Sequence, residues 1–187
     1  MLKKLAIFDL DGTLFDTTRV NFLAYEKVLA PRGFHPEFDF FRRECFGHDY
    51  GYFGPLLAPG ASPAELEAIH REKKACYGEF LDRAVKNEHL FSLLHLMRPE
   101  YHTALVTAGS RANSSQILRQ FGESDCFDLT LSAEDVTRAK PDPQGFRMAM
   151  AHFGVTPDQT IIFEDSPTGI AAAQAAGAGL FVVKGFN

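Results

Sequence analysis

The sequence contains few cysteines and no long apolar stretch. The cysteines are Cys45, Cys76 and Cys126. Their spacing forms no CxxC or Cys/His zinc pattern, so we expect reduced, mostly buried thiols in a reducing compartment. No apolar run is long enough to span a membrane, and the short run after Lys3 and Lys4 ends at Asp9, which argues against a signal peptide. We therefore expect a cytoplasmic protein that has no membrane partner.

The sequence also lacks a long basic run, internal repeats and low-complexity linkers. Its formal net charge is −5, and 45% of its 187 residues are hydrophobic and 23% charged, which is an ordinary globular composition. The missing basic run argues against nucleic acid or an anionic membrane as a partner. An anionic metabolite is not excluded, because a metal ion and local dipoles can reverse the field inside a site. The oligomeric state is not indicated.

Short apolar runs alternate with longer stretches of helical spacing, which favours an α/β fold with a parallel sheet. Residues 128–131 are a weak strand candidate, and the stronger buried strands are predicted at 5–8, 103–106, 160–163 and 180–183. Helices are predicted at 111–121, 142–153 and 167–176. The last helix is bounded by Ser166 as its N-cap and by Gly177 just past its end.

Residues 16–86 differ from the rest because they contain no convincing buried strand. Ser62 begins a capping box, and the apolar residues from Leu66 to Ala84 follow helical spacing. Thr17 or Thr18 caps an earlier helix. An insert of about seventy residues is far longer than one βαβ crossover. We therefore expect a small helical lid at 16–86 and a core made of residues 1–15 and 87–187. The alternative is that the extra helices pack on the sheet without a lid role.

The strongest chemical signal is the pair Asp9 and Asp11, which follows the first predicted strand and precedes Gly12 and Thr13. Open α/β sheets place their ligands at the ends of such strands. Two carboxylates this close repel each other unless one is protonated or a cation lies between them. The alternative is an acidic turn that closes the strand, with Gly12 and Thr13 as turn residues.

Two weaker signals follow later strands. Thr107 stands between a strand and a helix, where a hydroxyl and free backbone amides suit a phosphate group, although hydroxyl caps are common there. Lys140 precedes Pro141, which favours an extended backbone. Its ammonium could neutralise both a phosphate and a carboxylate nucleophile, and the alternative is a solvated surface lysine.

The fourth signal is the acidic pair Glu164 and Asp165 at the end of another predicted strand. Oxygen ligands and dense negative charge favour Mg²⁺, and helix capping is the alternative for this segment. A parallel sheet would gather nucleophilic acids, a phosphate-binding hydroxyl and metal-binding acids on one edge. Four coincidental turns would not be expected to supply so complete a set.

The order of these motifs resembles the haloacid dehalogenase-like hydrolase superfamily over nearly the whole chain. The segment 163–170 is particularly similar to the subfamily of β-phosphoglucomutase and phosphoglycolate-type phosphatases. The resemblance implies a Rossmann-like core with a helical cap inserted after the first motif. It also implies a Mg²⁺-dependent phosphatase that acts on a small phosphorylated metabolite.

The resemblance implies a role for each motif residue. Asp9 would attack phosphorus and form an aspartyl-phosphate, and Asp11 would act as general acid and then general base. Thr107 and the Ala108 amide would hold phosphoryl oxygens, and Lys140 would neutralise nucleophile and phosphate. The Mg²⁺ ligands would be Asp9, the Asp11 carbonyl and Asp165, with Glu164 binding directly or through water. True haloacid dehalogenases lack the second aspartate, so Asp11 points to phosphorus chemistry.

Two departures weaken the alternative of a sugar phosphomutase. Asn21 stands where β-phosphoglucomutases have a histidine, and the segment 47–50 lacks the arginine of their cap loop. Tyr50, Tyr52 and Phe53 would either shape the pocket or, more simply, pack in the core. A third alternative is a non-catalytic protein that binds a phosphorylated ligand, since fold alone does not prove activity. The sequence does not identify the substrate.

Overall fold

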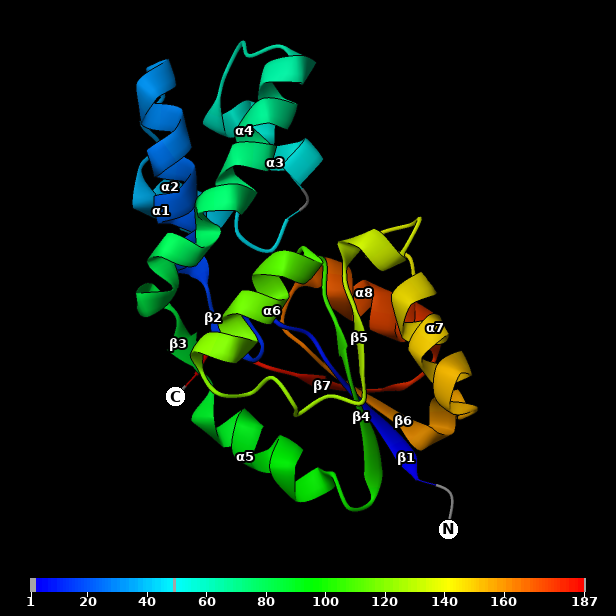
Figure 1. Ribbon diagram of the computed structural model, residues 1–187. Helices are drawn as coiled ribbons and strands as arrows, with labels where there is room; N and C mark the ends of the chain where they lie inside the picture. Colours follow the sequence, from blue (N-terminus) through cyan, green and yellow to red (C-terminus); the bar gives the residue numbers. More distant parts are fainter. Residues whose placement is uncertain (1–2, 49, 187) are drawn as a thin grey trace. The chain divides into compact units, whose positions relative to one another are not determined.

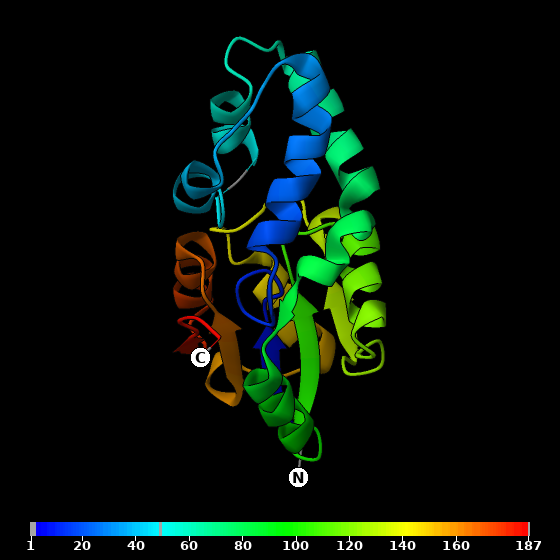
Figure 2. The ribbon, with the colours of Figure 1, turned by 90° about the vertical axis from the view of Figure 1, so that its left-hand side faces the viewer.

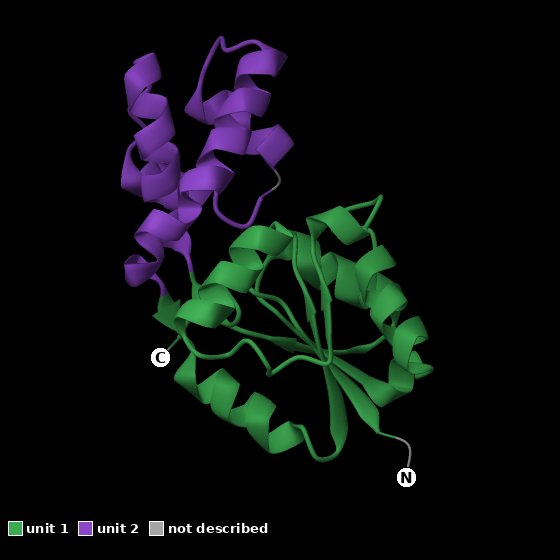
Figure 3. Ribbon diagram, viewed as in Figure 1, with its two compact units in different colours: residues 1–16, 85–187 green, residues 17–84 purple. Residues whose placement is uncertain are grey.

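The computed structural model describes residues 3–48 and 50–186. Asp49, which belongs to the cap-loop segment compared with mutases above, lies outside the described residues. The chain divides into two compact units, of which one is Met1–Asp16 together with Val85–Asn187 and the other is Thr17–Ala84 (Figure 3).

The first unit is built on a five-stranded parallel sheet with the strand order β5-β4-β1-β6-β7. Its strands are β1 (Lys4–Phe8), β4 (Tyr101–Val106), β5 (Leu129–Leu131), β6 (Thr160–Glu164) and β7 (Gly179–Val182). The central strand β1 is buried from Leu5 to Phe8, as its continuous apolar run predicts. The sheet confirms the α/β fold class and all five predicted strands, with shifts of one or two residues at their ends.

Helices cover both faces of this sheet (Figure 1). One face carries α5 (Glu88–Met97) and α6 (Arg111–Gln120), and the other carries α7 (Gln144–Phe153) and α8 (Pro167–Ala176). Figure 2 shows the same layers after a quarter turn. Short 3-10 helices η3 (Ala133–Asp135) and η4 (Pro157–Gln159) complete the unit. The buried faces of β1, β4, α7 and α8 form one apolar core.

Local sequence explains where α8 begins and ends. The Ser166 hydroxyl accepts a hydrogen bond from the Gly169 amide, Pro167 occupies the first turn, and Gly177 ends the helix with a φ of 77°. α8 therefore starts directly behind the acidic end of β6. Within the described part of the chain, no helix has both the length and the apolarity that a membrane span requires.

The second unit is helical. It contains α1 (Thr18–Leu29), η1 (Ala30–Arg32), α2 (Phe38–Glu44), α3 (Tyr50–Leu57), α4 (Pro63–Cys76) and η2 (Tyr77–Arg83). α4 begins with the predicted capping box between Ser62 and Glu65. The helical spacing through Ala84 predicted one continuous α-helix, but the α-helix ends at Cys76 and continues as a 3-10 helix. Gly78 lies in that second segment, and glycine weakens an α-helix.

An aromatic cluster forms the core of the helical unit. Phe41, Phe53 and Tyr25 are buried, with ring centroids between 5.6 and 6.2 Å apart. Tyr50 stacks on Tyr25 at 5.8 Å. Tyr52 is 57% exposed. The structure thus gives Phe53 and Tyr50 a packing role within this unit.

Two short antiparallel strands stand where the chain leaves and re-enters the first unit. They are β2 (Phe15–Asp16) and β3 (Val85–Lys86). Asn87 follows β3, and its side-chain amide donates to the Thr13 carbonyl at 3.1 Å while its side-chain oxygen caps α5. This residue therefore holds the loop after β1 against the start of α5.

Candidate active site

The carboxyl ends of β1, β4 and β6 bring the predicted motifs to one edge of the sheet. Phe8 is in register with Leu105 on one side and Phe163 on the other. The residues that follow each strand therefore lie side by side, and Asp9 is placed between the ends of the two neighbouring strands. This is the position at which open α/β sheets bind their ligands.

The loop after β1 turns sharply so that its polar side chains face this edge. Gly12 has a φ of 91°, which a residue with a side chain rarely adopts. A Cβ on Gly12 would lie 2.1 Å from Asp165 Oδ2, so the turn also needs glycine for close approach. The neighbouring Thr13 is buried, and its hydroxyl donates to Asp165 Oδ1 at 2.7 Å. The loop thus fixes one oxygen of the Asp165 carboxylate.

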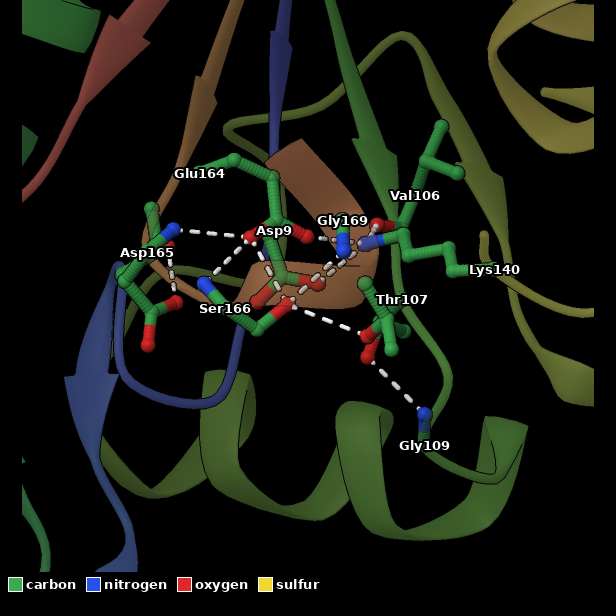
Figure 4. Close-up of polar contacts among 11 residues, drawn as sticks. Asp9, Val106, Thr107, Gly109, Lys140, Glu164, Asp165, Ser166 and Gly169 are labelled. Carbon is green, nitrogen blue, oxygen red and sulfur yellow. Dashed lines mark hydrogen bonds and ion pairs between the residues drawn. The ribbon is translucent and has the colours of Figure 1, made fainter. Parts of the chain in front are cut away.

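Lys140 lies at the centre of the site (Figure 4). Its Nζ donates to Asp9 Oδ1 at 2.6 Å, to Glu164 Oε1 at 2.7 Å and to the Val106 carbonyl at 3.0 Å. An ammonium has three N–H donors, and each has an acceptor here. The side chain is only 10% exposed, so the alternative of a solvated surface lysine is wrong.

Glu164 is fully buried at the end of β6. Its Oε2 accepts hydrogen bonds from the Asp165 amide at 2.7 Å and from the Ser166 amide at 2.8 Å. The Ser166 hydroxyl adds a third donor at 3.0 Å. Asp165, the next residue, is partly exposed. The two acids of the fourth motif therefore have different surroundings.

Thr107 and Asp11 lie around the loop that follows β4. The Thr107 hydroxyl accepts a hydrogen bond from the Gly109 amide at 2.9 Å, and Thr107 is buried. A Cβ on Gly109 would lie 3.3 Å from Thr107 Oγ1 and 3.4 Å from Asp11 Oδ2. The Asp11 carboxylate and the Thr107 hydroxyl therefore flank the same glycine. Ala108, which lies between Thr107 and Gly109 in the chain, is exposed.

Burial strongly affects the charges of the site. It raises the pKa of Asp9 well above the usual carboxyl value, an effect that Lys140 opposes and that Glu164 and Asp165 reinforce. Burial is also the largest cause that raises the pKa of Asp165, to about 6. For Lys140 burial lowers the pKa, but the Asp9 and Glu164 carboxylates outweigh this effect and the net pKa is raised. The site holds more negative charge than Lys140 alone can balance.

These residues fit a hard divalent cation. Oxygen atoms of Asp9, Glu164 and Asp165 lie within 4.8 Å of one another, and all the donors are carboxylates. Mg²⁺ prefers oxygen ligands, while softer metals prefer nitrogen or sulfur. Three carboxylates against one ammonium leave two negative charges when all are ionised, which matches one divalent ion.

Several contacts of the site were not foreseen from the sequence. Among them are the hydrogen bond from Thr13 to Asp165, the ion pair of Lys140 with Glu164, the Val106 carbonyl that accepts from Lys140, and the close approach of Gly169 to Glu164. The only available signals were the position of Thr13 in the first motif and the presence of Gly169 in a helix, where glycine is unfavourable. A backbone carbonyl gives no sequence signal at all.

The comparisons with known proteins agree with this geometry. The chain is 33% identical over 182 residues to a validoxylamine A 7'-phosphate phosphatase of Streptomyces hygroscopicus subsp. limoneus, covering 93% of this chain and 82% of that protein. It is 28% identical to a phosphorylated carbohydrates phosphatase of Thermotoga maritima, covering 91% and 80%. The crystal structure of CbbY from Rhodobacter sphaeroides in complex with phosphate has the same fold, with a TM-score of 0.81, 24% identity and coverage of 98% and 87%.

A family model also matches the chain directly. It is described as haloacid dehalogenase-like hydrolase, and the match runs from residue 6 to residue 183. The matched range includes every motif of the site, from Asp9 to Asp165. The protein therefore belongs to the haloacid dehalogenase-like hydrolase family, as the motif order predicted.

Proposed function

We propose that this protein is a Mg²⁺-dependent phosphatase that hydrolyses the monoester of a small phosphorylated metabolite, of the sugar phosphate class, through an aspartyl-phosphate on Asp9. The enzyme class, a phosphoric monoester hydrolase, follows from the family and from relatives that are phosphatases. One of these relatives acts on phosphorylated carbohydrates, which supports the substrate class.

The contact between Lys140 and Asp9 is the observation that carries the proposal. Nζ and Oδ1 are 2.6 Å apart in a buried site at the sheet edge. An ammonium held this close stabilises both an anionic nucleophile and the phosphoryl oxygens it attacks. A protein that only binds a phosphorylated ligand would not need a carboxylate at the point of attack, since it repels phosphate.

The reaction has two steps in this proposal. An Asp9 carboxylate oxygen attacks phosphorus, the ester P–O bond breaks, and Asp11 donates a proton to the leaving oxygen. Water then attacks the phosphoryl group and gives its proton to Asp11. The bond between phosphorus and Asp9 breaks, which releases orthophosphate and restores both carboxyl groups. Thr107 and the Ala108 amide hold the phosphoryl oxygens during both steps.

Asp9, the Asp11 carbonyl and Asp165 would hold the Mg²⁺ ion, with Glu164 binding directly or through water. Clustered carboxylate oxygens of Asp9, Glu164 and Asp165 and the excess negative charge of the site support this set. When bound, the ion supplies positive charge that offsets repulsion between the carboxylates and a phosphate. The Asp9 carboxylate is then ionised at neutral pH despite its burial.

The helical unit, residues 17–84, is proposed to act as the cap that selects the substrate. The aromatic core of this unit supports the proposal, because a unit with a core of its own can move as one body. The sugar phosphomutase alternative is less favoured. Asn21, which replaces the mutase histidine, is engaged inside this unit, where its amide donates to the Thr17 hydroxyl at 3.0 Å and accepts from Lys73.

The first experiment measures phosphate release from p-nitrophenyl phosphate with Mg²⁺, and then from a panel of phosphorylated sugars. EDTA is expected to stop the reaction. The Asp9→Asn variant is expected to lose turnover by at least about a thousandfold, while its circular dichroism spectrum stays unchanged. Normal turnover in this variant would contradict the mechanism.

Product analysis with a hexose 1-phosphate separates the alternatives. Free phosphate supports the phosphatase. An isomerised sugar phosphate without free phosphate would favour the mutase, and no reaction across the whole panel would favour a binding protein.

A further inference from the structure

The loop that carries Asp11 is a tight turn closed by its own backbone. The Leu10 carbonyl accepts hydrogen bonds from the Leu14 and Phe15 amides, each at 3.0 Å. The Gly12 amide donates to the Phe15 carbonyl at 2.8 Å. These bonds fix the shape of the turn, so its residues move together. They do not fix where the turn lies, because both partners of each bond belong to it.

Asn87 holds this turn from outside with two donors. Its backbone amide donates to the Leu14 carbonyl at 2.9 Å, and its side-chain amide donates to the Thr13 carbonyl at 3.1 Å. The two acceptors belong to successive residues of the turn, and both residues are fully buried. Asn87 is itself only 7% exposed, so water competes little for these bonds.

The side chain of asparagine suits this position for a chemical reason. Its oxygen accepts from the Leu90 amide at 3.1 Å and caps α5, while its nitrogen donates to the Thr13 carbonyl. One neutral amide group therefore serves the helix with its acceptor and the turn with its donor. Aspartate or serine at this position would still cap the helix. An ionised aspartate has no donor for the turn, and serine has one polar atom in place of two.

The strand just before Asn87 is anchored by contacts of its own. β3 pairs with β2, where Lys86 lies opposite Phe15. The Lys86 ammonium lies 2.7 Å from Glu123 Oε1 and 3.1 Å from Glu88 Oε2, and the Glu123 side chain is only 9% exposed. The chain is thus held in place where it returns from the helical unit. Asn87 follows directly, so the turn is bonded to an anchored segment.

We infer, on the basis of the proposed phosphatase function, that Asn87 is a positioning residue for the general acid Asp11. It contributes one of the two outside bonds that place the turn, and Asp11 moves with the turn. Proton transfer requires the acid to lie within hydrogen-bond reach of the leaving oxygen. A small displacement of the turn therefore slows the step that needs the proton and spares a step that does not.

The test uses Asn87→Asp at neutral pH, which keeps the shape and the cap oxygen and removes the donor. The constant kcat/KM is measured with p-nitrophenyl phosphate and with the best sugar phosphate of the panel. A nitrophenolate leaves with little help from an acid, whereas a sugar alkoxide needs a proton. We expect kcat/KM to fall about 10- to 100-fold for the sugar phosphate and less than about threefold for p-nitrophenyl phosphate. Equal losses for both substrates, or no loss for either, would overturn the inference.

Lys86→Met is the matched control at the neighbouring position. It removes the buried ammonium from the same strand and leaves both donors of Asn87 in place. We expect a lower urea denaturation midpoint and an unchanged ratio of the two kcat/KM values. The same change of ratio as in Asn87→Asp would show a general loosening and would contradict the inference. Asn87→Ser replaces Asn87→Asp if the carboxylate prevents folding, because serine keeps a cap oxygen without the charge.

Hydrogen exchange measured by mass spectrometry supplies a readout that needs neither substrate nor metal. Asn87→Asp should speed amide exchange in residues 10–15 more than in α5, whose cap it retains. Faster exchange in α5 alone would reduce Asn87 to a helix cap and overturn the inference. Asp11→Asn is assayed first and should show the same selective loss with the sugar phosphate. If it does not, the proposed role of Asp11 fails, and the exchange result still decides whether Asn87 holds the turn.

Discussion

Thr13 shows how a single uncharged side chain can set the geometry of a charged one. It is fully buried, and its hydroxyl donates to Asp165 Oδ1 across 152 positions of sequence. This hydrogen bond leaves the other oxygen, Oδ2, on the side of Gly12. Replacing a residue that orients a metal ligand typically lowers metal affinity or activity by about 10- to 100-fold.

The substitution Thr13→Val tests this role. Valine keeps the shape of threonine and removes the hydroxyl, so we expect Mg²⁺ affinity to fall about tenfold in calorimetric titration. Thr103→Val is the matched control, because Thr103 is equally buried and its hydroxyl bonds the Cys126 carbonyl instead. The control should lose stability and keep its Mg²⁺ affinity. Equal affinities in both variants would show that Thr13 does not orient the ligand.

At the scale of the element, α8 depends on a glycine in its first turn. Gly169 donates its amide to the Ser166 cap and leaves room for the Glu164 carboxylate. A helix gains stability when glycine is replaced by alanine, by about 1 kcal/mol, where the added methyl group has space. A methyl group at position 169 has no space, because the Glu164 carboxylate of β6 already occupies it. Packing against β6 therefore overrides helix propensity at this position.

We therefore predict that Gly169→Ala destabilises the protein by about 1–3 kcal/mol and also lowers kcat, because the methyl group displaces Glu164. Gly145→Ala in the first turn of α7 is the comparison. Its new Cβ would lie 2.9 Å from a single methyl group of Val106, and it gains the same helix propensity. The difference between their urea denaturation midpoints measures how much more the collision with the Glu164 carboxylate costs than the collision with the Val106 methyl group. A Gly169→Ala variant as stable as wild type would contradict the close approach.

At the scale of the whole molecule, the site lowers stability in the absence of metal. The pKa of Asp165 is about 6 in the folded protein, above the ordinary value of 3.8. At pH values between 3.8 and about 6, the Asp165 carboxyl keeps its proton in the folded state and releases it in the unfolded state. The free energy of unfolding therefore falls as the pH rises from about 4 to 6. Asp165 contributes up to about 2 kcal/mol of this loss. Asp9 shifts in the same direction.

We predict that Asp165→Asn becomes more stable than wild type in EDTA as the pH is raised from 4.5 to 7.5. The measurement is the urea denaturation midpoint of both proteins at the two pH values. Excess Mg²⁺ should reverse the order at pH 7.5, because it binds the folded wild type and not the unfolded chain. A constant difference between the two proteins at both pH values would rule out this account of Asp165.

The sequence by itself determined the fold class and the order of the site motifs. Apolar runs such as 160–163 predict buried strands, and caps such as Ser166 and Gly177 mark helix ends, because these signals depend only on neighbouring residues. The family followed from the same motifs. Helix α5 was missed, although Asn87 with Leu90, Phe91 and Leu94 carries a cap and a helical period that could have predicted it.

Only the tertiary structure decided how the charges of the site are paired. Lys140 lies 131 positions from Asp9 in sequence, and its three acceptors lie just after β1, at the end of β4 and at the end of β6. The sequence placed Glu164 and Asp165 together as metal-binding acids, whereas the structure gives them different donors and different exposure. The physical reason is that local sequence sets each strand and helix, but the register of the sheet sets which side chains share a buried space.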